Sequence, residues 1–151
     1  MLDKFLIEAI KRHMNETFPL ISQLDDSLLY SKPLADGRAL GEIIYHMLRS
    51  FEYYLRGLVE GVWEPSPHIF DGFVTHESLL ALWQEVYTKM KVYLSLIMLS
   101  DFSRVINGFN RPATFGEILL EMLEHSIHHR GQLTVYLRLL DIEPAKIEYI
   151  I

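Results

Sequence analysis

The chain has 151 residues, of which 50% are apolar and 12% aromatic, a composition typical of a folded domain with its own hydrophobic core. It has no cysteine, which excludes disulfides, thiolate metal sites and a cysteine nucleophile. The formal net charge of −6, without a cluster of Lys or Arg, argues against a nucleic-acid-binding protein. No apolar stretch approaches the ~18 residues of a membrane span, and the N-terminus has no signal-peptide pattern. We therefore expect one cytoplasmic domain over residues 1–151.

Four helical patterns follow one another along the chain, at about residues 2–29, 39–60, 76–99 and 114–140. In the first, we expect Pro19 to kink or break the helix, because proline lacks a backbone N–H. The third begins behind Thr75, a favourable N-cap residue. The fourth begins at Thr114, and Glu117 completes the spacing of a capping box.

The connections between these patterns differ in length. The segment 61–76 has 16 residues, including Pro65, Pro67 and Gly72. Fully extended it covers about 50 Å, more than the roughly 33 Å of a 22-residue helix. It can therefore cross the length of a bundle and make the second and third helices parallel. Farther on, Asn107-Gly108 lies between short apolar runs, which predicts a hairpin turn and a short β-ribbon.

Apolar residues recur at steps of three and four along the last three patterns, and this spacing predicts a four-helix bundle. Ser50 and Gly57 are small, and we expect them to leave room for a pocket near His46. The predicted inward positions are Ala39, Ile43, His46, Ser50, Tyr53 and Gly57; Leu79, Trp83, Val86, Met90, Tyr93 and Ile97; and Phe115, Ile118, Met122, His125, His129, Gln132, Tyr136 and Leu139.

Three of the seven histidines lie within five residues of the fourth pattern. His125 and His129 are spaced i, i+4, so they share one helix face about 6 Å apart along the axis and can chelate one divalent ion. His46 lies on another inward seam and can complete a three-histidine site with open coordination positions. His128 falls about 100° away, toward the surface, and His13 is interpreted as a packed residue. In a metal-free alternative, the three inward histidines hydrogen-bond to one another.

Polar residues around the histidine pair have two interpretations each. Glu121, one turn before His125, can be a fourth metal ligand, a general base, or a hydrogen-bond acceptor for a side chain that binds the metal. It can equally be an ion-paired surface carboxylate. Arg130 can hold an anion or make a helix contact, and Gln132 can hydrogen-bond a histidine ring. Gly131 allows close approach of another helix.

Three segments resemble the DinB superfamily of damage-inducible four-helix proteins: 37–42 leading to His46, 111–120, and His125 with the segment 129–132. The resemblance covers nearly the whole chain. It implies an up-down-down-up bundle, a metal triad at His46, His125 and His129, and a zinc, nickel or other divalent ion. It also implies a homodimer. Characterised members include thiol-S-transferases and maleylpyruvate isomerases that use low-molecular-weight thiols.

This chain departs from many relatives at Glu121, where they have a histidine, and at Ala39, where they have Ser or Thr. The triad is intact. We therefore expect an all-α enzyme, dependent on a Zn, Ni or Fe ion, that transfers a low-molecular-weight thiol to an electrophilic small molecule. Glu121 is the candidate for proton transfer. The alternatives are a metal-dependent hydrolase and a non-catalytic stress protein that binds a metal or a small ligand. We expect a small-molecule substrate and a homodimer, with no nucleic-acid or membrane partner.

Overall fold

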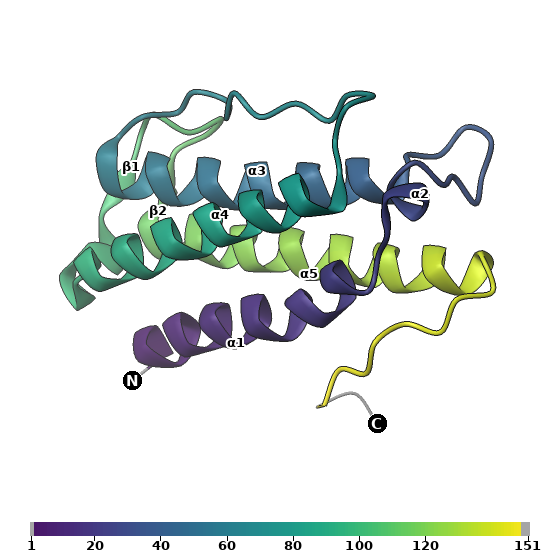
Figure 1. Cartoon of the computed structure of the whole chain (residues 1–151). Coiled ribbons are helices and arrows are strands. Elements are labelled where there is room, and N and C mark those ends of the chain that lie inside the picture. The colour runs from purple at the N-terminus through teal and green to yellow at the C-terminus, as the bar shows by residue number, and fades with distance from the viewer. Residues whose placement is uncertain (1, 149–151) are drawn as a thin grey trace.

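Four long helices pack side by side in residues 2–148, the part of the chain that the computed structural model describes (Figure 1). The predicted all-α four-helix bundle is confirmed. No helix in this part of the chain is long and apolar enough to cross a membrane. The long helices are α1 (Leu2–Ser22), α3 (Leu40–Glu60), α4 (His76–Leu96) and α5 (Phe115–Leu139); the short elements are α2 (Asp26–Leu29), the 3-10 helix η1 (Leu99–Ser103), β1 (Val105–Ile106) and β2 (Ala113–Thr114).

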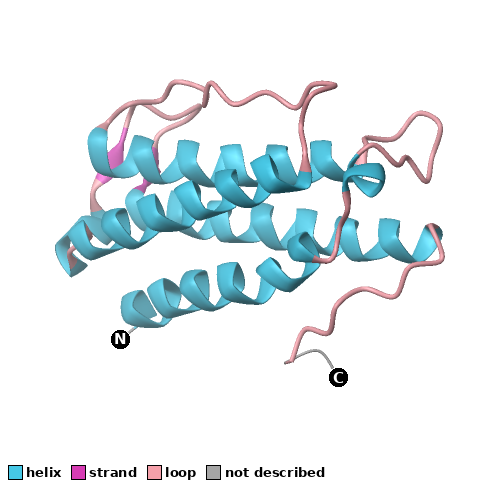
Figure 2. Ribbon diagram, in the orientation of Figure 1, coloured by secondary structure: helices cyan, strands magenta, loops and turns pink. Residues whose placement is uncertain are grey.

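The chain direction differs between the two pairs of long helices. Figure 1 shows α1 and α5 running one way along the bundle and α3 and α4 running the other way. The segment 61–75, which contains no helix or strand, returns along the outside of α3 so that α4 starts at the end where α3 starts (Figure 2). This placement lays an extended crossover segment along α3.

The ends of the helices carry the caps that their sequences indicate. At the start of α5, the Thr114 hydroxyl accepts a hydrogen bond from the Glu117 N–H at 3.3 Å, and the Glu117 carboxylate accepts one from the Thr114 N–H at 2.7 Å. The start of α3 is weaker, because Ala39 has no side-chain acceptor and only the Glu42 carboxylate accepts the Ala39 N–H, at 3.4 Å. Gly61 ends α3 with φ of 74°, a left-handed conformation that favours glycine.

Two local features differ from the sequence-based prediction. First, α1 continues through Pro19 to Ser22, and the chain then turns into the separate helix α2. Pro19 removes one hydrogen bond, to the carbonyl of residue 15, but it lies in the last turn of α1, and only three helical residues follow it. Second, Ile106 pairs with Ala113 and Val105 with Thr114 in the predicted β-ribbon, so a six-residue connection replaces the expected two-residue turn.

Most of the predicted inward positions form the hydrophobic core, including Trp83, Met90 and Phe115. Two expectations were wrong. Leu139 is 55% exposed, because α5 extends beyond the other helices near its end (Figure 1). Gly57 does not open the expected space near His46: a Cβ atom there would lie 2.2 Å from the Trp63 ring, so the crossover segment already fills that space.

Polar contacts are buried between α1 and α5. The buried His13 of α1 places Nε2 2.7 Å from the hydroxyl of Ser126 on α5. One turn further along both helices, the buried Arg130 of α5 lies 3.7 Å from the Glu16 carboxylate of α1. Burial, aided by the Arg130 guanidinium, lowers the pKa of His13 from 6.5 to about 3.

This low pKa predicts that His13 makes folding sensitive to acid. Between pH 6.5 and about 3, the unfolded chain binds a proton at His13 that the folded chain does not bind, so stability falls as the pH falls. At about pH 5 the group should cost about 2 kcal/mol of unfolding free energy relative to about pH 7.5. We expect urea unfolding to show this loss in the wild type and a correspondingly smaller loss in His13→Gln. An equal loss in both proteins would show that other groups carry the acid sensitivity.

Candidate metal centre

Three histidine rings meet between α3 and α5, which pack side by side in opposite directions (Figure 1). His46 comes from the second turn of α3, and His125 and His129 lie on successive turns of α5. The Nε2 atom of His125 lies 3.2 Å from Nε2 of His46 and 3.2 Å from Nε2 of His129. One nitrogen from each ring lies within 4.8 Å of the other two. Among the described residues, these three histidines form the cluster of potential ligands that is close enough to hold a metal ion. The structure thus brings together the triad predicted from the sequence.

The orientation of His129 is set by Gln132, one turn later on α5. The Nδ1 atom of His129 lies 3.0 Å from the Oε1 atom of Gln132. Because an amide oxygen only accepts hydrogen bonds, Nδ1 carries the ring proton. The Nε2 atom of the neutral ring therefore turns a lone pair toward the other two histidines. Metal-binding histidines are typically held in this way.

Hydrogen bonds among the three rings cannot satisfy all of their inward nitrogens. A neutral imidazole carries one proton, and in His129 it is on Nδ1. The Nε2 atom of His125 can donate to His129 or accept from His46, but one nitrogen cannot do both. One of the two 3.2 Å contacts is therefore left without a well-formed hydrogen bond. This disfavours the metal-free alternative, since a cation would accept all three lone pairs.

The spacing of the nitrogens also fits a small divalent ion. Two nitrogens bound about 2.05 Å from a tetrahedral zinc ion lie about 3.3 Å apart. Both short Nε2 contacts are 3.2 Å. The remaining pair, His46 and His129, lies within 4.8 Å. The donor set of three imidazoles suits zinc, nickel, copper or iron and leaves coordination positions for small molecules.

The surroundings keep the three rings neutral. Burial, followed by the charges of the neighbouring His129 and His46 rings, lowers the pKa of His125 from 6.5 to about 4. Burial is likewise the largest cause that lowers the pKa of His46 and of His129, and Arg38 adds a smaller lowering at each. Neutral imidazole is the form that binds a metal. The site therefore stays competent for metal below neutral pH.

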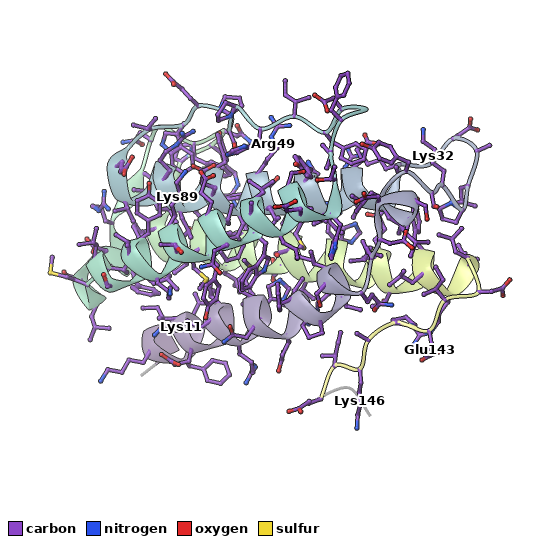
Figure 3. The ribbon with its side chains drawn as sticks, viewed as in Figure 1. Lys11, Lys32, Arg49, Lys89, Glu143 and Lys146 are labelled. Atoms are coloured by element: carbon purple, nitrogen blue, oxygen red, sulfur yellow. The ribbon has the colours of Figure 1, made fainter. Side chains whose placement is uncertain are left out.

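Open space adjoins the triad on the His46 side. One hollow of about 180 Å³ lies between α3 and the crossover segment, and a second of about 240 Å³ lies beside it. His46 and Arg49 line both hollows, and Arg38 lines the second. Figure 3 shows Arg49 projecting from α3 toward the crossover segment. Small molecules can therefore reach the triad past two guanidinium groups.

Aromatic rings lie next to His125. The Tyr54 ring centroid lies 6.3 Å from that of His125 and 5.6 Å from that of Phe109. Phe109 in turn lies 5.2 Å from Trp63, which contacts Tyr53 at 5.4 Å. Together these four partly buried aromatic residues form a cluster of ring contacts beside the triad.

Glu121 does not join the histidine cluster in the described chain. Its carboxylate forms an ion pair with Arg111, and its side chain is 34% exposed. It does lie near the aromatic residues: burial, followed by the Glu121 charge, raises the pKa of Tyr54. Its expected role in proton transfer remains a prediction.

The other residues of the fourth pattern have distinct environments. Gln132 contacts the His129 ring, as the sequence analysis allowed, and Arg130 makes a helix contact with Glu16 instead of facing the triad. Gly131 was expected to allow close approach of a helix, but nothing lies within 4 Å of a Cβ atom placed there. His128 is exposed, as predicted.

Sequence reasoning missed the arginines and one aromatic residue beside the triad. Arg49 follows His46 by three residues, so helical spacing alone could have placed it on the same face. Tyr54 follows His46 by eight residues, which also returns it near that face. Arg38 precedes α3 and gives no periodic signal. Its place depends on the fold of the preceding loop.

Comparisons with known proteins show the family and agree with the fold. The DinB family model matches residues 1–150. The uncharacterized protein YjoA of Bacillus subtilis strain 168 is 28% identical over 137 residues, covering 88% of this chain and 87% of that protein. A crystal structure of a DinB-like protein from Bacillus subtilis superposes with a TM-score of 0.78 at 24% identity, covering 94% of this chain and 96% of that one. One from Bacillus cereus ATCC 10987 gives 0.79 at 21% identity, covering 94% and 95%.

The neighbouring residues His128 and His129 provide a direct test of the site. His129→Ala removes an inward nitrogen and should lower the affinity for zinc by well over tenfold. His128→Ala changes an exposed side chain and should leave stoichiometry and affinity nearly unchanged. Calorimetric titration of the metal-stripped proteins measures both. A loss at His128 equal to or larger than that at His129 would mean that the wrong face of α5 has been assigned.

Proposed function

Since this chain belongs to the DinB family, we propose that it is a divalent-metal-dependent enzyme that transfers a low-molecular-weight thiol to an electrophilic small molecule. The observation that supports this most is the convergence of three neutral imidazole nitrogens beside open hollows. A buried structural site would need no such access. Zinc, nickel and iron all suit the three ligands His46, His125 and His129.

A divalent ion, when bound, supplies a Lewis acid that stabilises the deprotonated form of a thiol or of water. The chain itself contributes position and environment. Three neutral imidazoles leave the charge of the ion uncancelled, and Gln132 orients His129. The rings of Tyr54 and Phe109, beside His125, offer an apolar surface to the electrophile.

Glu121 is the proposed acceptor of the thiol proton. It lies one turn before His125 on α5, and Arg111 holds its carboxylate in place. In the proposed step, the S–H proton moves to the Glu121 carboxylate and the sulfur electron pair forms a bond to an electrophilic carbon. The leaving group departs with the electron pair of the bond that breaks. Positioned carboxylates typically contribute factors of about 10² to 10⁴ to such steps.

Two alternative functions would use the same site: hydrolysis, with water in place of the thiol, and binding of a metal or small ligand without reaction. The hollows beside His46 favour a function in which a small molecule enters. For the partner, we propose a second copy of the chain. The exposed apolar side chains Phe5 on α1 and Val92 and Leu96 on α4 are available for such a contact.

The proposal predicts metal-dependent thiol transfer. Zinc-loaded or nickel-loaded protein, incubated with a panel of low-molecular-weight thiols and chlorodinitrobenzene, should form the thioether faster than the metal-stripped protein. Glu121→Gln should lower kcat by about 10²-fold or more. Glu124→Gln, which changes an exposed carboxylate on the same helix, is the control and should have little effect.

The other functions give different results in the same assay. Release of nitrophenol from nitrophenyl acetate without any thiol would support the hydrolase. Stoichiometric metal binding without turnover of either substrate would support the binding protein. Equal activity in Glu121→Gln and Glu124→Gln would remove Glu121 from the mechanism.

A further inference from the structure

We propose that the hollow between α3 and the crossover segment is a carboxylate-binding subsite, in which Arg49 and Ser66 hold an acidic group of the molecule that reacts at the triad. The inference rests on the proposed function and adds that one of the two substrates carries a carboxylate. The acidic group can belong to the thiol or to the electrophile, because both must lie beside the triad to react.

The hollow is built on one stripe of α3. His46, Arg49, Ser50 and Tyr53 have the spacing i, i+3, i+4 and i+7, which puts them on one helix face. Pro65 and Ser66 of the crossover segment complete the lining of this space of about 180 Å³. A molecule bound here therefore touches both a candidate metal ligand and the crossover segment.

Two polar atoms in this lining, one on Arg49 and one on Ser66, have no hydrogen-bond partner within the described chain. The Nη2 atom of Arg49 donates a hydrogen bond to the Ser66 carbonyl oxygen at 3.0 Å, which fixes the guanidinium against the crossover segment. Within the described chain, the buried Nε atom of Arg49 and the buried hydroxyl of Ser66 have no hydrogen-bond partner. Leaving such groups buried and unpaired is costly, especially for a charged donor. Neighbouring atoms cover both in the free protein, so an acceptor in the hollow would satisfy them once the Arg49 and Ser66 side chains turn toward it.

The charge of the lining selects an anion. No acidic residue is among those that line the first hollow. In the adjoining hollow, Arg38 and Arg49 face a single acidic residue, Glu42, whose carboxylate lies 3.9 Å from Arg38. A guanidinium N–H beside a hydroxyl matches the two oxygens of a carboxylate, and the fixed planar geometry of arginine favours this recognition.

The position of Arg49 limits the size of the ligand. Residues three apart on a helix have Cβ atoms about 5–6 Å apart, so Arg49 and His46 are within reach of one small molecule. A carboxylate held by Arg49 would place a sulfur or an electrophilic carbon only a few bonds away near the triad. Short mercapto acids and short unsaturated or halogenated acids have this length.

Calorimetry with paired ligands tests the subsite separately from activity. The zinc-loaded protein is titrated with 3-mercaptopropionate and with its neutral amide, and then with propionate and propionamide. We expect 3-mercaptopropionate to bind at least about tenfold more tightly than its amide. Arg49→Gln should abolish that preference while leaving the affinity for the amide unchanged. Arg49→Lys, which keeps the charge but lacks the Nε donor, should retain only part of it.

Arg56 provides the matched control. It lies two turns after Arg49 on α3, and its Nη2 atom likewise donates to a crossover carbonyl, that of Glu64. It lines neither hollow. Arg56→Gln should therefore keep the preference for the carboxylate. Thermal unfolding of both variants checks that the crossover segment stays packed.

The ligand pairs distinguish the source of the carboxylate. If the preference for the carboxylate over its amide depends on Arg49 in the thiol pair, the carboxylate belongs to the thiol. If that preference appears only in the propionate pair, the carboxylate belongs to the other substrate. Both results support the subsite. A preference for 3-mercaptopropionate that persists in Arg49→Gln would overturn the subsite, since the carboxylate would then bind the metal directly. Binding of the thiol amide with no preference in either pair would also overturn it and leave the proposed function intact. Arg49-dependent binding of propionate, with no binding of any thiol, would support the subsite and contradict thiol transfer.

Discussion

The packing of α3 against α5 is the constraint on which the site depends. It brings one histidine from the first helix and two from the second so close that their Nε2 atoms lie 3.2 Å apart in two of the three pairs. Neutral rings at this distance cannot all be satisfied by one another, because His129 already uses its proton on Gln132. The cost of this arrangement is offset when the three lone pairs share a cation. The rest of the bundle holds the two helices in the register that makes this possible.

Residues outside the triad give its two sides different surroundings. Aromatic side chains lie beside His125, whereas the guanidinium of Arg49 lies beside His46. The two sides of the triad therefore differ in polarity. A small molecule with an acidic group at one end and an apolar group at the other would match both sides. The crossover segment contributes to each, through Ser66 on the polar side and Trp63 on the apolar side.

The part of the fold that depends on local spacing was predictable from the sequence. The pair His125 and His129 follows from helical periodicity, and the start of α5 follows from Thr114 and Glu117, whose side chains act within one turn. The parts that depend on distant contacts were not predictable. The Trp63 ring fills the space at Gly57, and Ser66 accepts the Arg49 hydrogen bond, because a long extended segment settles against α3 in one particular way. No periodic pattern encodes that position. The sequence around Gly131 likewise did not indicate that no other segment packs against that residue of α5.

Anomalous X-ray scattering from crystals of the zinc-loaded protein tests the central claim most directly. Data collected on the two sides of the zinc absorption edge locate the ion independently of any assumption about its ligands. The account predicts one strong peak per chain between α3 and α5, about 2.0–2.1 Å from Nε2 of His46, His125 and His129. A zinc peak elsewhere, such as at the carboxylate of Glu121 with the three rings still hydrogen-bonded among themselves, would contradict it.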